Sequence, residues 1–154
     1  MAQAKDEPLL KPLFDSKLDG AKVSSLECPT CKQKLVEEDY EGVPIHRCVF
    51  CEGTLIDRKK MPRISFRKQK AFDERLRKLA EIARKDGEQK QRSRVRPEPS
   101  PFPCPACGQK MWRGFYSYQY PVEVDKCVLC SMVWFDKDEL EILQALIEAR
   151  DASA

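Results

Sequence analysis

The chain lacks the features that mark most enzymes. Its 154 residues include one histidine, His46, so no second histidine is present to serve a nucleophile. It also has no glycine-rich phosphate loop of the kind that binds nucleotides. Because no catalytic constellation can be assembled from these residues, we expect a protein that is not an enzyme.

Long apolar segments are also missing. No apolar run approaches the ~20 residues that a membrane-spanning helix needs. The N-terminal stretch "MAQAKDEPLLKPLF" has no basic region followed by an apolar stretch, as a signal peptide would have. We therefore expect no direct membrane span and a cytoplasmic location, where thiols stay reduced and disulfides are uncommon.

Cysteine, in contrast, is abundant, and all eight cysteines fall into C-x2-C pairs. The four pairs group as C-x2-C-x16-C-x2-C and C-x2-C-x19-C-x2-C. Both groups have the spacing of a four-cysteine zinc site, because two tight turns that face each other can direct four sulfurs at one ion. We predict two Zn²⁺ ions per chain, and the predicted ligands are Cys28, Cys31, Cys48 and Cys51 for one ion and Cys104, Cys107, Cys127 and Cys130 for the other.

Other uses of paired cysteines stay open. A single C-x2-C pair is also typical of a disulfide or a thioredoxin-like redox centre, and four thiolates also suit iron. The repetition at ribbon spacing favours zinc over redox use, and the hairpin-length gaps favour zinc over iron–sulfur. The zinc-containing regions of J-domain chaperones also repeat such pairs, but with abundant glycine, and this chain has only six glycines.

The two cysteine groups belong to a unit that occurs twice. "CPTCKQK" at 28–34 resembles "CPACGQK" at 104–110, and "CVFCEGTLIDRKKM" at 48–61 aligns with "CVLCSMVWFDKDEL" at 127–140. In both copies, apolar residues alternate with other residues just before the third cysteine, which predicts a strand. Each copy is therefore expected to run knuckle, strand, knuckle and then a final segment.

The final segment differs between the copies. In the second copy, Asp136 and Glu139 have the spacing of a capping box and precede an apolar stripe, which predicts a helix from about 137 to 150. In the first copy, Pro62 disfavours a continuous helix at the same place.

These repeats resemble zinc ribbons of the transcription factor IIB type, a family widespread in bacterial proteins. The family motif runs CPxC, a strand, and then CxxCGGxWLDxxEL. The second copy matches it at Cys104, Pro105, Cys107, Cys127, Cys130, Trp134, Asp136, Glu139 and Leu140. The first copy matches it at Cys28, Pro29, Cys31, Cys48, Cys51, Gly53 and Asp57. The departures are Ser131 and Met132 in the second copy, and Glu52, Leu55, Lys60 and Met61 in the first. The resemblance implies a ribbon fold more firmly than an activity, and related ribbons also occur attached to membrane domains.

Charge is divided unevenly along the chain. Residues 58–96 contain 16 Lys and Arg against five Asp and Glu, a net charge of +11, whereas the rest of the chain carries −8. Apolar residues at helical spacing predict a helix here that ends near Gly87, followed by a flexible proline-rich linker. Segment 58–96 is the expected contact with nucleic acid. Its candidate phosphate-binding residues are Arg63, Arg67, Lys68, Lys70, Arg92 and Arg94.

An alternative for the same helix is a solvated surface whose apolar stripe packs on a ribbon or on a partner protein. Pairs of opposite charge at i,i+4, such as Glu81 and Lys85, favour this alternative because they neutralise charge within the helix. The candidate surface for a protein partner is the stripe Phe72, Leu76 and Leu79.

Aromatic residues near the second ribbon leave a similar choice. Alternating tyrosines could stack on nucleic-acid bases, or they could pack one face of a strand against the ribbon. They are Tyr116, Tyr118 and Tyr120. His46, two residues before Cys48, is expected on the exposed face of its strand, since four cysteines already complete the site.

Together these observations predict a small metal-stabilised α+β protein. It would consist of two four-cysteine zinc ribbons, built from short β-hairpins with a C-terminal helix, and joined by a basic helical linker. The expected divisions are a disordered lead at 1–24, a first ribbon at 25–62, the basic helix and linker at 63–103, and a second ribbon with its helix at 104–150. Units this small need metal to fold, and we expect them to fold separately.

The expected function is that of a non-catalytic tandem zinc-ribbon module associated with nucleic acid or the transcription machinery. The alternative is a protein–protein adaptor, or the soluble regulatory part of a larger assembly, membrane-associated or not.

Overall fold

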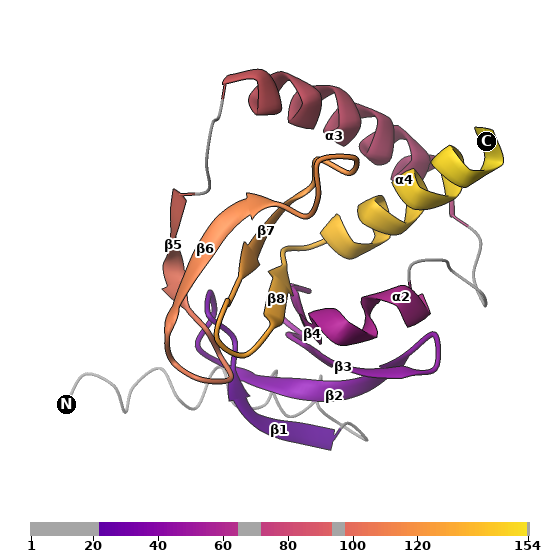
Figure 1. Ribbon diagram of the computed structural model, residues 1–154. Helices are drawn as coiled ribbons and strands as arrows, with labels where there is room; N and C mark the ends of the chain where they lie inside the picture. The colour runs from indigo at the N-terminus through magenta and orange to yellow at the C-terminus, as the bar shows by residue number, and fades with distance from the viewer. Residues whose placement is uncertain (1–21, 65–71, 94–97, 154) are drawn as a thin grey trace.

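The computed structural model describes residues 22–64, 72–93 and 98–153 (Figure 1). Most of the expected lead at 1–24 lies outside these residues, although the first strand already begins at Lys22. Among the described helices, none is long and apolar enough to cross a membrane.

All strands of the described chain belong to one antiparallel sheet of eight strands, in the order β1-β2-β3-β4-β8-β7-β6-β5. The first copy supplies β1 (Lys22–Glu27), β2 (Lys34–Tyr40), β3 (Val43–Arg47) and β4 (Thr54–Asp57). The second copy supplies β5 (Glu98–Pro103), β6 (Lys110–Phe115), β7 (Glu123–Lys126) and β8 (Met132–Phe135). The strand order reads the same from either edge, so an approximate twofold axis between β4 and β8 relates the copies.

The pairing of β4 with β8 corrects the expectation of two small ribbons joined only by a linker. Leu55 lies directly opposite Trp134, and these residues occupy the same position in the two copies. The pairs on either side of them are equally symmetric. The ribbons are thus halves of one curled sheet, because the last strand of each ribbon offers a free edge that the other can pair with.

The proline-rich stretch expected as part of the linker also contributes to the sheet. Residues Glu98–Pro103 form the edge strand β5, in which Pro99 lies opposite Trp112 and Pro103 opposite Lys110. Proline is compatible with an edge strand where its backbone nitrogen points away from the neighbouring strand, since no N–H is needed there.

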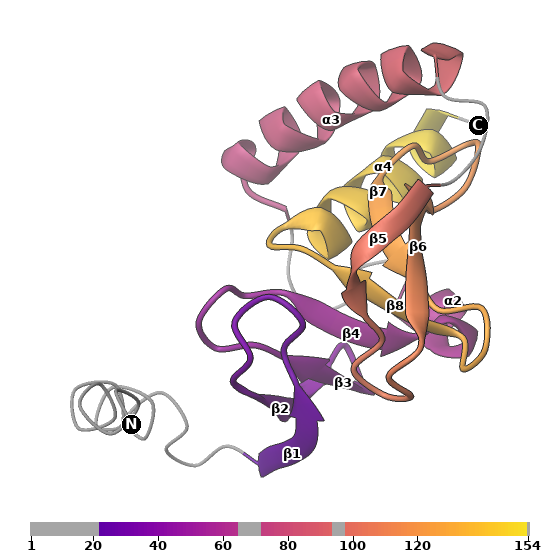
Figure 2. The same cartoon turned by 90° about the vertical axis from the view of Figure 1, so that its left-hand side faces the viewer.

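The helices pack over one face of the sheet (Figures 1 and 2). After β4 the described part of the first copy forms η2 (Arg58–Lys60) and α2 (Met61–Ile64). Pro62 is the second residue of α2 and does not break the helix there, because proline is tolerated in the first turn of a helix. The predicted C-terminal helix is confirmed as α4 (Glu139–Ser153). The basic helix α3 (Glu74–Ser93) lies alongside α4 in both views.

The predicted end of the basic helix at Gly87 was wrong. Helix α3 continues to Ser93, and buried Gly87 lies where the helix touches the loop before β7. A Cβ added at Gly87 would come within 2.2 Å of the carbonyl oxygen of Pro121. The glycine therefore permits a close approach between the helix and this loop rather than ending the helix.

Two apolar clusters lie on opposite faces of the central strands. The larger cluster joins Ile56, Val133 and Phe135 to α2, α3 and α4. The smaller cluster joins Leu55 and Trp134 to cysteines of both metal-binding groups. Alternation along β4 and β8 thus sends one set of side chains toward the helices and the other toward the knuckles.

Candidate metal centres

Each C-x2-C pair sits in a turn that is closed by backbone hydrogen bonds. The N–H of Cys28 donates to the carbonyl of Gln33 at 2.7 Å, and the N–H of Lys32 donates to the carbonyl of Cys28 at 2.9 Å. The N–H of Cys31 also donates to the Cys28 sulfur at 3.2 Å. Comparable backbone bonds close the turns that begin at Cys48, Cys104 and Cys127.

The residue after the second cysteine of each pair has a left-handed backbone. The φ angles are 62° at Lys32, 61° at Glu52, 74° at Gly108 and 61° at Ser131. This conformation suits glycine, and a residue with a Cβ adopts it at a cost of about 1 kcal/mol. Three of the four turns therefore carry strain that a glycine would remove.

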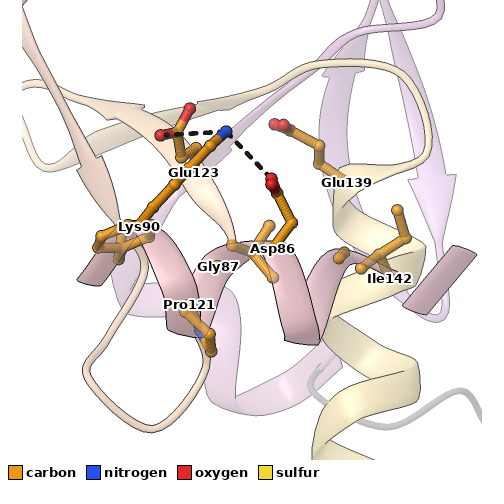
Figure 3. A pocket seen from close by; sticks show the side chains of 10 residues that line it. Asp86, Gly87, Lys90, Pro121, Glu123, Glu139 and Ile142 are labelled. Atoms are coloured by element: carbon orange, nitrogen blue, oxygen red, sulfur yellow. Dashed lines mark ion pairs between the residues drawn. The ribbon is translucent and has the colours of Figure 1, made fainter. Parts of the chain in front are cut away.

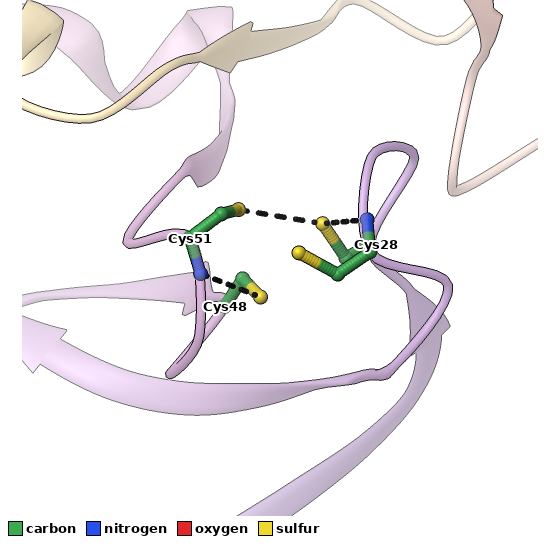
Figure 4. Close-up of side chains that lie close together, drawn as sticks. Cys28, Cys48 and Cys51 are labelled. Atoms are coloured by element: carbon green, nitrogen blue, oxygen red, sulfur yellow. Dashed lines mark hydrogen bonds between the residues drawn. The ribbon is translucent and has the colours of Figure 1, made fainter.

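The turns bring the predicted ligands together into two clusters of four cysteines. In each cluster the four sulfurs all lie within 4.8 Å of one another. Figure 4 shows Cys28, Cys48 and Cys51 with their sulfurs directed into a common space. All eight predicted ligands are therefore in place.

The sulfur spacing fits a metal ion better than a disulfide. The sulfur–sulfur distances are 3.6 Å between Cys28 and Cys51, 3.3 Å between Cys104 and Cys130, and 3.5 Å between Cys107 and Cys127. Disulfide sulfurs lie only about 2.05 Å apart, whereas tetrahedral zinc with bonds of ~2.3 Å needs sulfurs about 3.8 Å apart. Each cluster can hold one metal ion, consistent with two zinc ions per chain.

The pKa shifts of the cysteines also favour binding of a metal ion. A hydrogen bond from Cys28 lowers the pKa of Cys48 to about 5, whereas the same bond and burial raise the pKa of Cys28. In the second cluster burial opposes ionisation of Cys127, but the N–H of Cys130 and nearby thiols bring its pKa down to about 7. One thiolate in each cluster is thus stabilised by protonated neighbours, and a bound divalent cation would displace the protons from the other thiols.

Comparison with known families agrees with this chemistry. Residues 27–65 match the family model described as "Transcription factor zinc-finger". The first copy is therefore similar to the zinc ribbons of that family. No curated protein and no solved structure matches the chain. The second copy lies outside the matched residues, but its cysteine cluster has the same ribbon arrangement.

A direct contact couples the two ribbons beside the metal centres. A Cβ added at Gly53 would lie 2.2 Å from Cζ2 of Trp134, so the indole of the second copy rests on the backbone of the first. The family motif contains both a glycine and a tryptophan at these positions. Here the first copy retains Gly53 and has Leu55 in place of the tryptophan, while the second retains Trp134 and has Met132 in place of the glycine.

A buried glutamine forms a second link that the sequence alone did not reveal. Gln144 on α4 is fully buried, accepts a hydrogen bond from the hydroxyl of Tyr40 at 2.8 Å, and donates one to the carbonyl of Ile64. Both partners belong to the first copy. The only signal in the sequence was a polar residue within the apolar run of the helix.

The capping-box prediction was correct in part. Glu139 accepts a hydrogen bond from the N–H of Asp136 at 3.0 Å, as expected. The carboxylate of Asp136, however, accepts a bond from the indole N–H of Trp134 at 3.1 Å. Burial, together with the charge of Asp136, raises the pKa of Glu139 to about 8.

Glu139 also lines a cavity of about 120 Å³ between α3, α4 and the loop before β7 (Figure 3). The ammonium of Lys90 lies 3.1 Å from Asp86 and 3.9 Å from Glu123 in this cavity. In this cavity Lys90 therefore joins α3 to Glu123 at the start of β7.

Only two of the six candidate nucleic-acid residues lie within the described part of the chain. Arg63 on α2 and Arg92 near the end of α3 are both exposed. The others, Arg67, Lys68, Lys70 and Arg94, lie outside the described residues.

Most other cations of α3 are already paired with acids. Arg84 contacts Glu81 at 2.6 Å and Glu88 at 3.0 Å. Arg75 contacts Asp138 at 2.6 Å. Weaker contacts join Lys78 to Glu74 and Lys85 to Glu81. The helix therefore presents less unbalanced positive charge than its sequence suggested.

The apolar stripe of α3 faces the chain's own core. Leu76 is buried, and Phe72 and Leu79 pack partly buried against the larger cluster. In this arrangement the stripe is covered, so the binding of a protein partner stays a prediction that needs another surface.

The remaining aromatic and histidine expectations have mixed outcomes. The tyrosines lie at or in the loop after β6 rather than along a strand: Tyr116 packs near Phe135, with ring centroids 6.4 Å apart, while Tyr118 is 87% exposed. His46 is only partly exposed, and burial lowers its pKa. It belongs to neither cysteine cluster.

Proposed function

We propose that this chain is a non-catalytic zinc-binding module that associates with nucleic acid or with the transcription machinery. The observation that carries the proposal is the match of residues 27–65 to a transcription-factor zinc-finger family, over a segment whose four cysteines converge on one point. A site closed by four thiolates has no open position for water or substrate, which supports a structural role for the metal.

The test is salt-dependent binding to nucleic acid. Five phosphate contacts to duplex DNA would give a slope of about −4.5 in a plot of log affinity against log salt concentration. Replacement of Arg67, Lys68 and Lys70 by glutamine should flatten that slope by roughly 2–3 units while zinc content stays the same. If the zinc-loaded chain binds neither DNA nor RNA at about 50 mM salt, the proposal is wrong.

A protein–protein adaptor is the second candidate, and one surface favours it. The tip of the second knuckle of the second ribbon exposes Val128 and Leu129, at 74% and 71% of their surface. Neighbouring exposed apolar residues often mark a protein contact. Capture of partners from nuclease-treated lysate by the wild-type chain, and its loss on replacing both residues by serine, would favour the adaptor.

A further inference from the structure

The approximate twofold axis allows equivalent charged residues of the two copies to be compared directly. Arg47, just before the third cysteine of the first copy, corresponds to Lys126 in the second. Arg58, which follows β4, corresponds to Lys137, which follows β8. Each end of the strand pair β4–β8 thus carries one cation from each copy.

At one end, acids neutralise both cations. Arg47 lies 3.4 Å from Glu38 and 3.5 Å from Glu141. Lys137 lies 2.9 Å from Glu52, the residue that follows the last cysteine of the first copy. We call Arg47 and Lys137 with their acids the neutralised end.

At the other end, the equivalent cations have no acid partner among the described residues. Lys126 donates to the backbone carbonyls of Phe115 and Tyr116, at 2.7 and 3.0 Å. These bonds use two of its three N–H donors and neutralise none of its charge. The position equivalent to Glu52 is Ser131, whose carbonyl accepts the N–H of Arg58 but which brings no charge.

Further cations gather beside Arg58. Residues 57–64 contain four basic residues and a single acid, Asp57, whose carboxylate accepts the N–H of Lys59 at 3.0 Å. Arg58, Lys59 and Arg63 are exposed. Burial raises the pKa of Tyr116, and the charge of Arg58 opposes this rise, so this guanidinium lies near the residue that Lys126 contacts.

We propose that Arg58, Lys59, Arg63 and Lys126 form the surface through which this module contacts the phosphates of nucleic acid. We call these four residues the basic end. Unpaired cations on a rigid scaffold attract a polyanion, whereas cations with acid partners contribute little. Three of the four residues follow strand β4 of the first copy and the fourth ends strand β7 of the second, so the surface exists only because β4 pairs with β8. This inference rests on the proposed function and assigns it a location.

The sharpest test recreates at the basic end the ion pair of the neutralised end. Ser131→Glu places a carboxylate beside Arg58, at a position whose equivalent, Glu52, already carries glutamate with the same φ of 61°. The substitution should therefore be tolerated. With a fluorescent random-sequence 20-base-pair DNA at about 50 mM salt, we expect affinity to fall several-fold and the salt slope to flatten by about 1 unit.

Charge-matched variants separate location from net charge. Arg58→Gln and Lys137→Gln remove one cation each, at the basic and the neutralised end respectively. We expect several-fold weaker binding for Arg58→Gln and less than a twofold change for Lys137→Gln. Zinc content measured for every variant confirms that both ribbons remain folded.

Each outcome decides a separate point. Equal weakening by Arg58→Gln and Lys137→Gln, or no effect of Ser131→Glu, would overturn the inference and leave the proposed function standing. Absence of DNA and RNA binding by the wild-type chain would overturn both. Tighter binding to vesicles containing phosphatidylserine than to DNA, with the same dependence on Arg58, would overturn the inference in favour of an anionic membrane surface.

Discussion

The two ribbons have the same strand order but divide the remaining tasks between them. The first copy contributes Gly53, on which the indole of Trp134 rests, and the basic residues after β4. The second copy contributes that tryptophan and the long helix α4, which covers the larger cluster. Neither copy holds both the glycine and the tryptophan of the family motif, and the contact between the copies uses one of these residues from each.

The metal centres differ as well. In the first cluster no cysteine is fully exposed, whereas Cys107 of the second cluster is exposed and its neighbouring knuckle presents Val128 and Leu129 to solvent. Two copies of one sequence unit can thus form a single sheet while their metal centres differ in exposure. We expect the packing of each copy to depend on the other, and the two metal centres to respond differently to substitution.

The largest effect is expected from loss of one metal centre. Cys28→Ser should remove zinc from the first cluster, at a cost on the order of 10 kcal/mol of binding free energy. Because β4 and β8 share the sheet, we expect amide signals of both copies to shift, in contrast to the separate folding that the sequence suggested. Amide NMR spectra and zinc content measure this.

Cys104→Ser provides the matched experiment in the second copy. If either variant leaves the amide spectrum of the other copy unchanged, the ribbons fold separately after all.

The contact between the copies should respond strongly to Gly53→Ala. The added methyl group would meet the Trp134 ring at 2.2 Å, so we expect the free energy of unfolding to fall by about 3 kcal/mol. Denaturant unfolding of the zinc-loaded protein measures the loss.

Trp134→Leu is the control, because it gives the second copy the residue that the first carries at Leu55. In the Trp134→Leu background, Gly53→Ala should cost much less. If the losses of unfolding free energy caused by the two substitutions simply add, the cost of Gly53→Ala does not come from the contact with Trp134.

A pH-dependent effect is expected at Glu139. Its pKa is about 8 in the folded chain against an ordinary value of 4.5, so the folded state binds the proton more tightly than the unfolded state. The stabilising contribution is complete below about pH 4.5 and is lost as the pH rises toward 8. Glu139→Gln should therefore be more stable than wild type by about 1–3 kcal/mol at pH 8.5, with a smaller difference at pH 5.5.

Thermal unfolding across this range, with zinc in excess, measures the difference. Glu141→Gln, which removes a carboxylate two residues along the same helix, serves as the control. A constant gap between wild type and Glu139→Gln at all pH values would contradict the prediction.

The smallest effect concerns the left-handed turn residues. Lys32 and Gly108 occupy the same position in the two copies, with φ angles of 62° and 74°. Lys32→Gly should stabilise the protein by up to about 1 kcal/mol, and Gly108→Ala should destabilise it by a similar amount. Melting temperatures would show shifts of opposite sign, and shifts of the same sign would count against strain as the cause.

The sequence by itself determined the metal centres. The paired cysteines and the turns between them are local features, and local spacing sets where the sulfurs point. The strand before each third cysteine and the helix α4 likewise follow from nearby residues: alternation before Cys48 and Cys127, and the pair Asp136 and Glu139.

Only the tertiary structure decided how these parts combine. The pairing of β4 with β8, the burial of Gln144 and the close approach of Gly87 to Pro121 join residues far apart in the chain. Periodicity identifies an apolar face but not what covers it, so the stripe of α3 could not be assigned to the chain's own core in advance. The same division applies to the charged residues. The net charge of +11 in segment 58–96 follows from the sequence, but the acid that each cation contacts depends on which elements lie beside it.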